Sequence, residues 1–348
     1  MIFSQRLFVL SAIIFVAFLS SCNKEGGPGS KPPAVFDSTE KANPVTVSEK
    51  EHRIFVRPKV GDVYRYRISQ HSNSSAISAG AVSGSESAQS EDSYYLTQTV
   101  RAIRADSSVD MSYRFDTISV KSEKDTAKIN LSSSRPADRK DPRFSTYAAL
   151  LGEDIGVIIS PYGDIKEMYG TSNIISSIMK RYPDSLRTAE NTSAVKQQIE
   201  ATIGQYIHET MMHFPHHPLA KDSVDRAEFQ QNSPIWGNVI YPMVISIKQT
   251  LTGFEERGGK VQAVFMTNTE FKPMQSVIEN GPVKATLNNY IASTKEELRV
   301  DDTNGELIYR KVNDDQSFTL ILDSKDQQGK GLTTERKSKV TRIVELLR

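Results

Sequence analysis

The strict alternation of apolar and polar side chains in two stretches constrains the fold of this 348-residue chain more than any other feature. In the clearer stretch, four large apolar residues are each followed by a polar one. A period of two places the two sets on opposite faces of a β-strand. A strand with one apolar face must bury that face, so the pattern predicts a sheet that packs against another layer. The apolar residues are Val109, Met111, Tyr113 and Phe115 in one stretch and Tyr64, Tyr66 and Ile68 in the other.

Two segments near the middle of the chain have the 3.6-residue spacing of helices instead. Thr171 or Ser172 can cap the first, and Pro183 ends it. The second is predicted from Ser193 to Met212. Its apolar stripe is too wide to face water, so we expect it to pack on the sheet over the aromatic strand residues. The stripe consists of Val195, Ile199, Ile203, Tyr206, Ile207 and Met211.

The rest of the chain predicts further strands, about ten in all. Residues 72–93, rich in Ser, Ala and Gly, are predicted to form a long mobile hairpin loop, and Asn304-Gly305 a two-residue hairpin turn. Together these patterns predict an α+β fold: a mainly antiparallel, curved, half-barrel-like β-sheet with two inserted helices at about residues 171–213. Two β lobes around a helical middle is the competing division. The other predicted strands span residues 94–104, 128–132, 155–160, 165–168, 236–255, 261–266, 285–300, 318–322 and 333–347.

The N-terminus has the layout of a bacterial export signal. Arg6 precedes an apolar run from Leu7 to Leu19, which is too short for an ordinary membrane span. Leu19-Ser20-Ser21-Cys22 follows and resembles the lipobox of bacterial lipoproteins, which implies cleavage before Cys22 and lipidation of Cys22. The alternative is a single-span anchor with an incidental cysteine. We expect a signal peptide at residues 1–21, a lipidated Gly- and Pro-containing tether at 22–52 and a globular domain at 53–348.

Cysteine content and charge exclude several classes of protein. Cys22 is the only cysteine, so disulfides, a thiol nucleophile and cysteine metal sites are excluded from the globular domain. Removal of residues 1–21 takes away Arg6 and no acidic residue, which leaves 42 basic and 42 acidic residues. No basic stripe for nucleic acid is present. Asn23 stands where an Asp would retain an enteric lipoprotein in the inner membrane. We therefore expect an outer-membrane lipoprotein, with the leaflet left open.

Candidate chemical motifs do not assemble into a catalytic, cofactor or metal site. His208 and His213 lie five residues apart, which on a helix turns them about 140° from each other, whereas zinc-protease helices need a spacing of four. His208 lies opposite the apolar stripe, so we expect it to be solvated; His216 and His217 sit in a Pro-flanked turn. Ser177 and Lys180 fit a Ser-x-x-Lys spacing but lack the partner motifs. Residues 301–305 lack the later ligands of a calcium loop and read as a turn.

The strand aromatics allow two interpretations. Tyr64, Tyr66, Tyr113 and Phe115 could line a cavity for an apolar ligand, or they could fill the core between the sheet and the helices. The second interpretation is favoured here, because large aromatic residues on the apolar face of a strand most often pack in a core.

Several segments, taken in order, resemble one uncharacterised family of Gram-negative envelope lipoproteins. The resemblance covers the chain from about Arg53. It implies a location in the cell envelope and a fold type, but no enzymatic reaction. Lys221-Asp222-Ser223-Val224 departs from the Gly-Asp-Ser-Trp that this family usually has there. The matching segments are Gly61-Asp62-Val63-Tyr64-Arg65-Tyr66, Ile159-Ser160-Pro161-Tyr162-Gly163-Asp164-Ile165, Phe214-Pro215-His216-His217-Pro218-Leu219 and the hairpin from Ser293 to Tyr309 with Asp301 and Gly305 at its turn.

These observations favour a membrane-anchored envelope lipoprotein without enzymatic activity. We expect a binding or accessory module for a lipid or protein partner, held on the membrane through Cys22. Two alternatives remain open: an envelope hydrolase whose site assembles from scattered residues, and a structural partner of an outer-membrane complex. A deep apolar cavity, a cleft with converging polar side chains, or a flat exposed apolar patch would distinguish the three.

Overall fold

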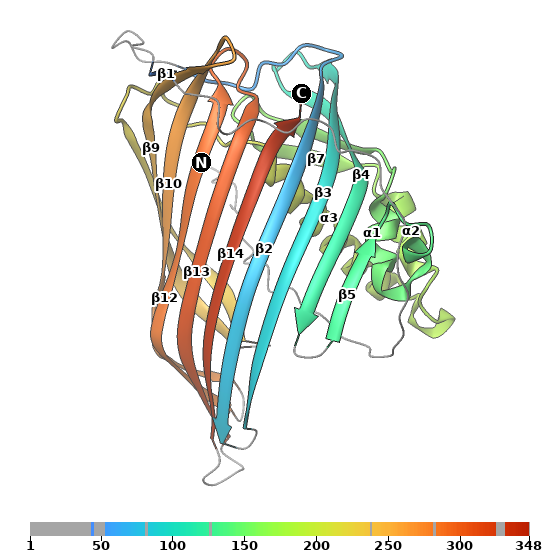
Figure 1. Cartoon of the computed structure of the whole chain (residues 1–348), viewed down its shortest axis with the longest axis vertical. Helices are drawn as coiled ribbons and strands as arrows, with labels where there is room; N and C mark the ends of the chain where they lie inside the picture. Colours follow the sequence, from blue (N-terminus) through green and yellow to red (C-terminus); the bar gives the residue numbers. More distant parts are fainter. Residues whose placement is uncertain are drawn as a thin grey trace.

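One large antiparallel β-sheet dominates the computed structural model, which describes residues 43–44, 53–80, 83–124, 127–236, 239–280, 283–324 and 331–347. The sheet is strongly curved, and helices lie beside one part of it (Figure 1). The predicted fold class is therefore confirmed. The sheet is continuous, so the division into two β lobes is wrong. None of the helices in the described residues is both long and apolar enough to cross a membrane.

The sheet contains fourteen strands in the described residues, all paired antiparallel. Their order is β1-β9-β10-β12-β13-β14-β2-β3-β4-β6-β7, with β8 on β9, β11 on β12 and β5 on β4. The strands are β1 (Asn43–Pro44), β2 (Val63–Gly80), β3 (Gly84–Ile103), β4 (Val109–Lys124), β5 (Ala127–Ser132), β6 (Ile155–Ile159), β7 (Ile165–Tyr169), β8 (Val224–Trp236), β9 (Val239–Arg257), β10 (Lys260–Pro273), β11 (Val277–Asn280), β12 (Val283–Asp301), β13 (Leu307–Ser324) and β14 (Leu332–Leu347).

Three α-helices, rather than the predicted two, are present in the described part of the chain. They are α1 (Ser145–Leu150), α2 (Ser172–Met179) and α3 (Ala189–Glu209). The extra helix is α1, which is only six residues long but buries Ala149 and Leu150. The long helix α3 begins four residues before its predicted start, because the Thr188 hydroxyl caps it by accepting a hydrogen bond from the Asn191 amide at 3.2 Å.

The serine-rich stretch, predicted to be a mobile loop, is part of two long strands. β2 continues to Gly80 and β3 starts at Gly84. Serine has little preference for strands, but Ser72 to Ser78 pair with β14 on one side and with β3 on the other. Backbone pairing on both sides outweighs the weak local preference. The strand β8 was also missed, because most of its residues are charged or polar, it contains Pro234, and its large apolar residues do not recur at every second position.

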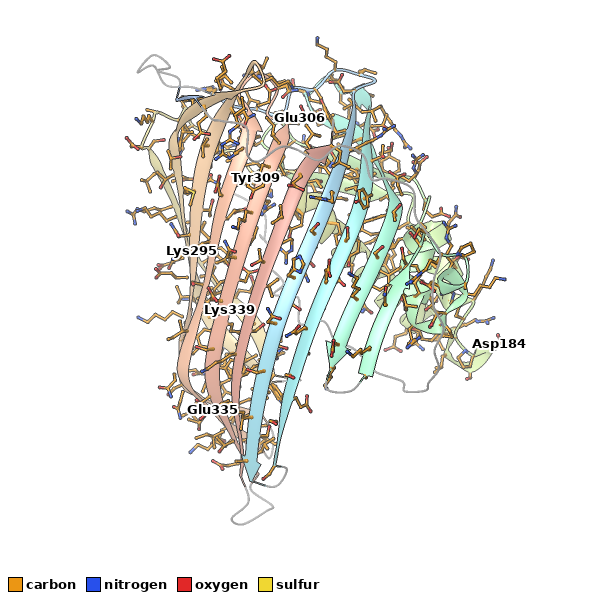
Figure 2. All side chains as sticks on the ribbon, viewed as in Figure 1. Asp184, Lys295, Glu306, Tyr309, Glu335 and Lys339 are labelled. Atoms are coloured by element: carbon orange, nitrogen blue, oxygen red, sulfur yellow. The ribbon has the colours of Figure 1, made fainter. Side chains whose placement is uncertain are left out.

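A helix-covered cluster forms the core at one end of the sheet. Ile199, Ile203 and Ile207 of α3 pack with the buried residues Tyr66, Tyr113 and Phe115 of the sheet. The Tyr206 ring lies 4.6 Å from that of Tyr94 and 5.4 Å from that of Phe115, between ring centroids. The predicted packing of the long helix over the aromatic strands is confirmed. The opposite, convex face of the sheet carries exposed charged side chains such as Lys295, Glu335 and Lys339 (Figure 2).

Candidate functional site

A second apolar cluster lies on the concave face, and it contains no helical residue. Its buried members come from β8, β9, β10, β12 and β13 only, so this strand-only cluster is enclosed by the curvature of the sheet itself. Half-exposed apolar side chains border it, among them Phe229, Trp236 and Leu322. The buried members are Ile235, Tyr241, Met243, Ile245, Ile247, Phe271, Ala285, Leu287, Ala292, Phe318 and Leu320.

Next to this cluster, the concave face changes from apolar to hydroxyl-bearing. The even-numbered residues of β2 share one face because the pairing of β2 has no register shift. Tyr66 and Ile68 on that face are buried in the helix-covered cluster. Farther along the strand the same face carries only small residues, and they are half-exposed. We call this region of β14, β2 and β3 the hydroxyl wall; it consists of Ser72, Ser74, Ser78, Ser90, Thr334 and Ser338.

The hydroxyls of the wall are partly paired with one another. The Oγ atoms of Ser72 and Ser90 lie 2.7 Å apart, and Ser78 Oγ lies 3.1 Å from Thr334 Oγ1. Ser74 stands opposite Ser338 on β14 and Ala88 on β3. Small side chains over three adjacent strands leave the wall without the bulk that fills the helix-covered cluster. Thr334 is buried and the other five wall residues are half-exposed, so most of this part of the concave face is accessible and polar.

The edge strand β8 approaches β14 across the concave face. Four strands separate β8 from β14 in the sheet order. The Arg336 guanidinium of β14 nevertheless lies over the Trp236 ring of β8, with its carbon 5.6 Å from the ring centroid. The sheet must therefore curl round the strand-only cluster. We call the line where β8 meets β14 the seam; it separates the cluster from the hydroxyl wall.

The seam places the charged side chain of Arg336 beside the apolar cluster. In the strand pairing, Arg336 stands opposite Phe318 on β13 and opposite Ala76 on β2. Burial lowers the pKa of the Arg336 guanidinium. Within the described residues the guanidinium makes no hydrogen bond or ion pair. Its contact with the Trp236 ring is a cation–π interaction. A guanidinium carries five N–H donors, so this one is available to an acceptor from outside the chain.

Between the two apolar regions lies an ion network that joins α3 to the sheet. Arg342 Nη1 lies 2.6 Å from Glu209 Oε1 at the end of α3, and Arg342 Nε donates to Gln70 Oε1 at 3.0 Å. Arg310 pairs with Glu296 and donates to the backbone oxygen of His208 at 2.6 Å. Arginines at a helix C-terminus offset its partial negative charge. The network holds the end of α3 on β13 and β14.

Asp92 lies on the rung beside this network without a cation of its own. It is opposite Gln70 on β2, its side chain is buried, and its Oδ1 has no hydrogen-bond partner within the described residues. Burial, with a smaller contribution from Glu91, raises the pKa of Asp92 to about 7. A carboxyl group in this position is stable in its protonated form near neutral pH.

Two of the segments that carry the family resemblance, at 159–165 and 214–219, meet in adjacent loops. The Phe214 amide donates to the Tyr162 oxygen at 2.9 Å, and the rings of Tyr162 and His216 stack at 3.9 Å between centroids. Gly163 has a φ of +88°, and a Cβ there would lie 2.1 Å from the Met212 oxygen, so only glycine fits. The motifs therefore position loops against one another.

The histidines lie differently from the sequence-based expectation. His208 and His213 were expected to point to different sides of a helix, but α3 ends at Glu209 and the chain turns. His213 Nε2 lies 3.2 Å from His208 Nδ1, and His213 Nδ1 lies 3.2 Å from Asp164 Oδ1. His208 is exposed, as predicted. The described residues contain no group of three or more His, Cys, Asp or Glu side chains that could hold a metal ion, and the absence of a metal stays a prediction.

The Asp164–His213–His208 series does not have the order of an acyl-transfer triad. The Ser160 hydroxyl donates to Asp164 Oδ2 at 3.1 Å, so this serine contacts the carboxylate rather than a histidine. The His213 ring holds the pKa of Asp164 down at about 2. Ser177 and Lys180 are exposed on and beside α2, away from these groups. Cys22, the predicted lipidation residue, lies outside the described residues.

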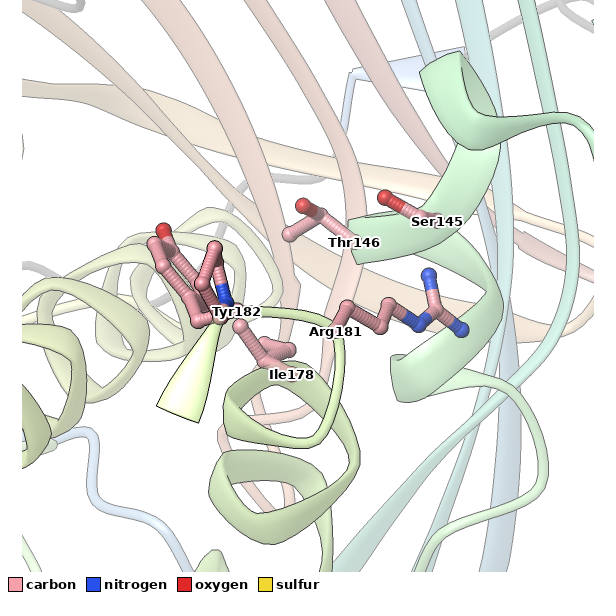
Figure 3. Close-up of a pocket in the computed structure, with 6 residues that line it drawn as sticks. Ser145, Thr146, Ile178, Arg181 and Tyr182 are labelled. Atoms are coloured by element: carbon pink, nitrogen blue, oxygen red, sulfur yellow. The ribbon is translucent and has the colours of Figure 1, made fainter. Parts of the chain in front are cut away.

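Two small hollows lie elsewhere in the domain. One of about 240 Å³ lies beside α1 and the end of α2, and Ser145, Thr146, Arg181 and Tyr182 border it (Figure 3). Another of about 30 Å³ lies near Tyr64. Both are below the roughly 300 Å³ at which small-molecule pockets begin. Tyr66, Tyr113 and Phe115 are buried in the helix-covered cluster, so they fill core as favoured from the sequence.

Sequence reasoning did not single out Trp236, Arg336 or the hydroxyl wall. Trp236 and Arg336 are 100 residues apart, and only the curl of the sheet brings them together. A signal was nevertheless present, because small hydroxyl residues recur at every second position from Ser72 to Ser78 with one exception, Ala76. That period of two is the strand period with small instead of large side chains.

Comparison with known proteins yields one family and distant structures. A model described as a family of unknown function, DUF6263, matches residues 106–305. No curated protein matches. A structure of lipid–protein interactions in lipovitellin is 10% identical over 83% of this chain with a TM-score of 0.38, and this chain spans 25% of the lipovitellin chain. The Pseudomonas aeruginosa proteins OpdQ and OccK7 (OpdD) are each 6% identical, over 83% of this chain and 100% of theirs, with TM-scores of 0.22 and 0.21.

Proposed function

We propose, from the premise that this chain belongs to DUF6263, a family of unknown function, that it is a membrane-anchored, non-enzymatic binding module of the bacterial cell envelope. Its ligand is an apolar or amphiphilic molecule, and its binding surface is the seam with the adjoining hydroxyl wall. The helix-covered half of the sheet serves as the rigid support.

The observation that carries this proposal is the pairing of two unlike surfaces on one concave face. Half-exposed Phe229, Trp236 and Leu322 border the strand-only cluster, and on β14 Arg336 stands between this cluster and the strands of the hydroxyl wall. No helical residue belongs to this cluster, whereas α3 covers the other one. Apolar surface beside a few placed polar groups is the usual composition of a ligand site.

The first experiment tests binding with the chain from residue 23 to residue 348, which keeps every described residue and lacks the lipid-bearing cysteine. The probe is N-phenyl-1-naphthylamine, whose fluorescence rises in an apolar environment. Ser74→Leu fills the hydroxyl wall and should weaken probe binding about tenfold or more. Ser75→Leu is the matched control, because the neighbouring side chain is exposed on the opposite face and should leave binding unchanged.

Equal binding by the two leucine variants, or no binding by the unsubstituted chain, would contradict the proposed surface. In the second case a structural partner of an outer-membrane complex becomes the better account of the domain.

The anchoring part of the proposal rests on the Leu19-Ser20-Ser21-Cys22 motif. Cys22→Ser should abolish lipidation and the maturation that follows it, because the serine hydroxyl offers no thiolate to the transferase. Metabolic labelling with a fatty acid, followed by separation of outer and inner membranes, measures both effects. A Cys22→Ser chain that is still shortened and still carries label would show that the anchor is not on this cysteine.

A further inference from the structure

The surroundings of Arg336 indicate which amphiphiles the seam would take. On its rung of the concave face the neighbours are Phe318, Ala76 and, one strand farther, Glu86. Phe318 belongs to the strand-only cluster, and Ala76 interrupts the hydroxyl wall. The guanidinium is thus placed where the apolar and the hydroxyl-bearing surfaces meet.

The nearby acidic groups on this face are engaged with other partners. Glu86 forms an ion pair with Lys124, with 2.9 Å between Oε2 and Nζ. Asp314, which faces Val340 two rungs away, accepts a hydrogen bond from the Thr294 hydroxyl. Arg336 itself has no acceptor within the described residues. A half-buried guanidinium without acceptors is unfavourable, so its position is best explained by an anionic partner that is not part of this chain.

Trp236 fixes the orientation of the guanidinium. The Arg336 guanidinium carbon lies over the indole ring, 5.6 Å from its centroid, within the range of a cation–π interaction. The contact with the ring uses no N–H donor, so the donors are left for hydrogen bonds. A planar fork of donors fits carboxylate and phosphate oxygens, to which it can donate two parallel hydrogen bonds.

We propose that Arg336 binds the anionic headgroup, a carboxylate or a phosphate, of a single-chain amphiphile whose hydrocarbon tail lies along the seam. This inference rests on the proposed function. Ser338, two residues farther along β14 and half-exposed, supplies a hydroxyl donor near the headgroup. The half-exposed side chains of Trp236, Phe229 and Leu322 receive the tail. A free anion would use the first set only, whereas an amphiphile uses both.

The test compares Arg336→Gln with Lys337→Gln in the chain from residue 23 to residue 348. Both variants lose one positive charge on β14, but Lys337 is exposed and points to the convex face. Arg336→Lys is a third variant, which keeps the charge and loses the fork. The probes share a twelve-carbon tail: laurate, dodecyl phosphate and the neutral ester monolaurin, all below their critical micelle concentrations. Inorganic phosphate is the probe without a tail.

Arg336→Gln should weaken laurate and dodecyl phosphate binding about ten- to hundredfold and leave monolaurin unchanged, since a hydrogen bond to a charged group is lost only with the anionic probes. Lys337→Gln should bind all probes as the unsubstituted chain does, and Arg336→Lys should fall between. Without ligand, Arg336→Gln should melt at the same or a higher temperature, because it removes a charge that has no partner. The two anionic probes, compared with each other, show which headgroup is preferred.

The possible failures are distinct. If all three amphiphiles bind and Arg336→Gln changes none of them, the role of Arg336 is wrong while the proposed function stands. If inorganic phosphate binds as tightly as dodecyl phosphate, the site recognises an anion alone and the amphiphile is wrong. If no amphiphile binds to the unsubstituted chain, the proposed function itself fails. A strongly destabilised Arg336→Gln chain would show that Arg336 is a structural residue.

Discussion

The two halves of the concave face are built on the same strands, and they differ in the volume of the side chains that point inward. On β2 and β3, Tyr66 and Leu96 are opposite each other under α3, while Ser74 and Ala88 hold the equivalent places farther along. The first pair is buried and the second is half-exposed. An identical backbone ladder thus supports a filled core at one end and an accessible polar surface at the other, which indicates that side-chain volume, not strand geometry, decides where a ligand can lie.

The largest effect on stability is expected from a substitution that removes side-chain volume in the helix-covered half. Ile203 is fully buried between α3 and the sheet, so Ile203→Ala should lower the free energy of unfolding by about 2–5 kcal/mol. Urea denaturation of the chain from residue 23 to residue 348 measures this change. A loss below about 1 kcal/mol would show that the space under α3 is loosely filled, and the contrast between the halves would disappear.

The stability of the folded chain should depend on pH through Asp92, which lies at the border between the halves. Its pKa is raised to about 7 in the folded chain, above the usual value of an unfolded Asp near 3.8. The folded state therefore binds the proton more tightly, and this group's contribution to stability decreases as pH rises from about 4 to about 7. Asp92→Asn should remove that dependence and stabilise the protein at pH 8 by roughly 1–3 kcal/mol.

Thermal or urea unfolding at pH 5 and at pH 8 checks this prediction. The gain from Asp92→Asn should be clearly larger at pH 8 than at pH 5. Equal gains at both values would mean that Asp92 finds a partner on the border and is not the origin of the pH dependence.

A smaller effect on stability is expected when a larger side chain is introduced into each half. Ala263 is fully buried in the helix-covered cluster, and Ala263→Leu should cost about 1–3 kcal/mol because no space is left. Ser74→Leu adds a similar volume to the hydroxyl wall and should change stability by no more than about 0.5 kcal/mol. Similar costs for the two changes would show that the hydroxyl wall is packed as tightly as the core.

The sequence predicted the helix-covered half far better than the seam, for a physical reason. The alternation from Val109 to Asp116 and the stripe on α3 are local patterns of large apolar residues, and both elements were found. The stretch from Ser72 to Ser78 became strand only through pairing with β14, whose residues lie more than 250 positions away. Side chains that form the seam share no local pattern, since the curl of the whole sheet decides that β8 reaches β14.

The histidine series illustrates the same limit at short range. A spacing of five residues places two side chains on different sides only while the helix continues, and α3 ends at Glu209 between His208 and His213. The helix end was predicted three residues too late, and this small error in a boundary reversed the expected geometry.

Hydrogen exchange measured by mass spectrometry tests the central claim, that ligands bind at the seam, most directly. The chain from residue 23 to residue 348 is compared with and without saturating laurate. Bound ligand should slow exchange in peptides from β2 around Ser74, from β14 around Arg336 and from β8 around Trp236, and leave Ile199 to Ile207 of α3 unchanged. Protection confined to α3, or no protection at all under conditions of full binding, would contradict the account.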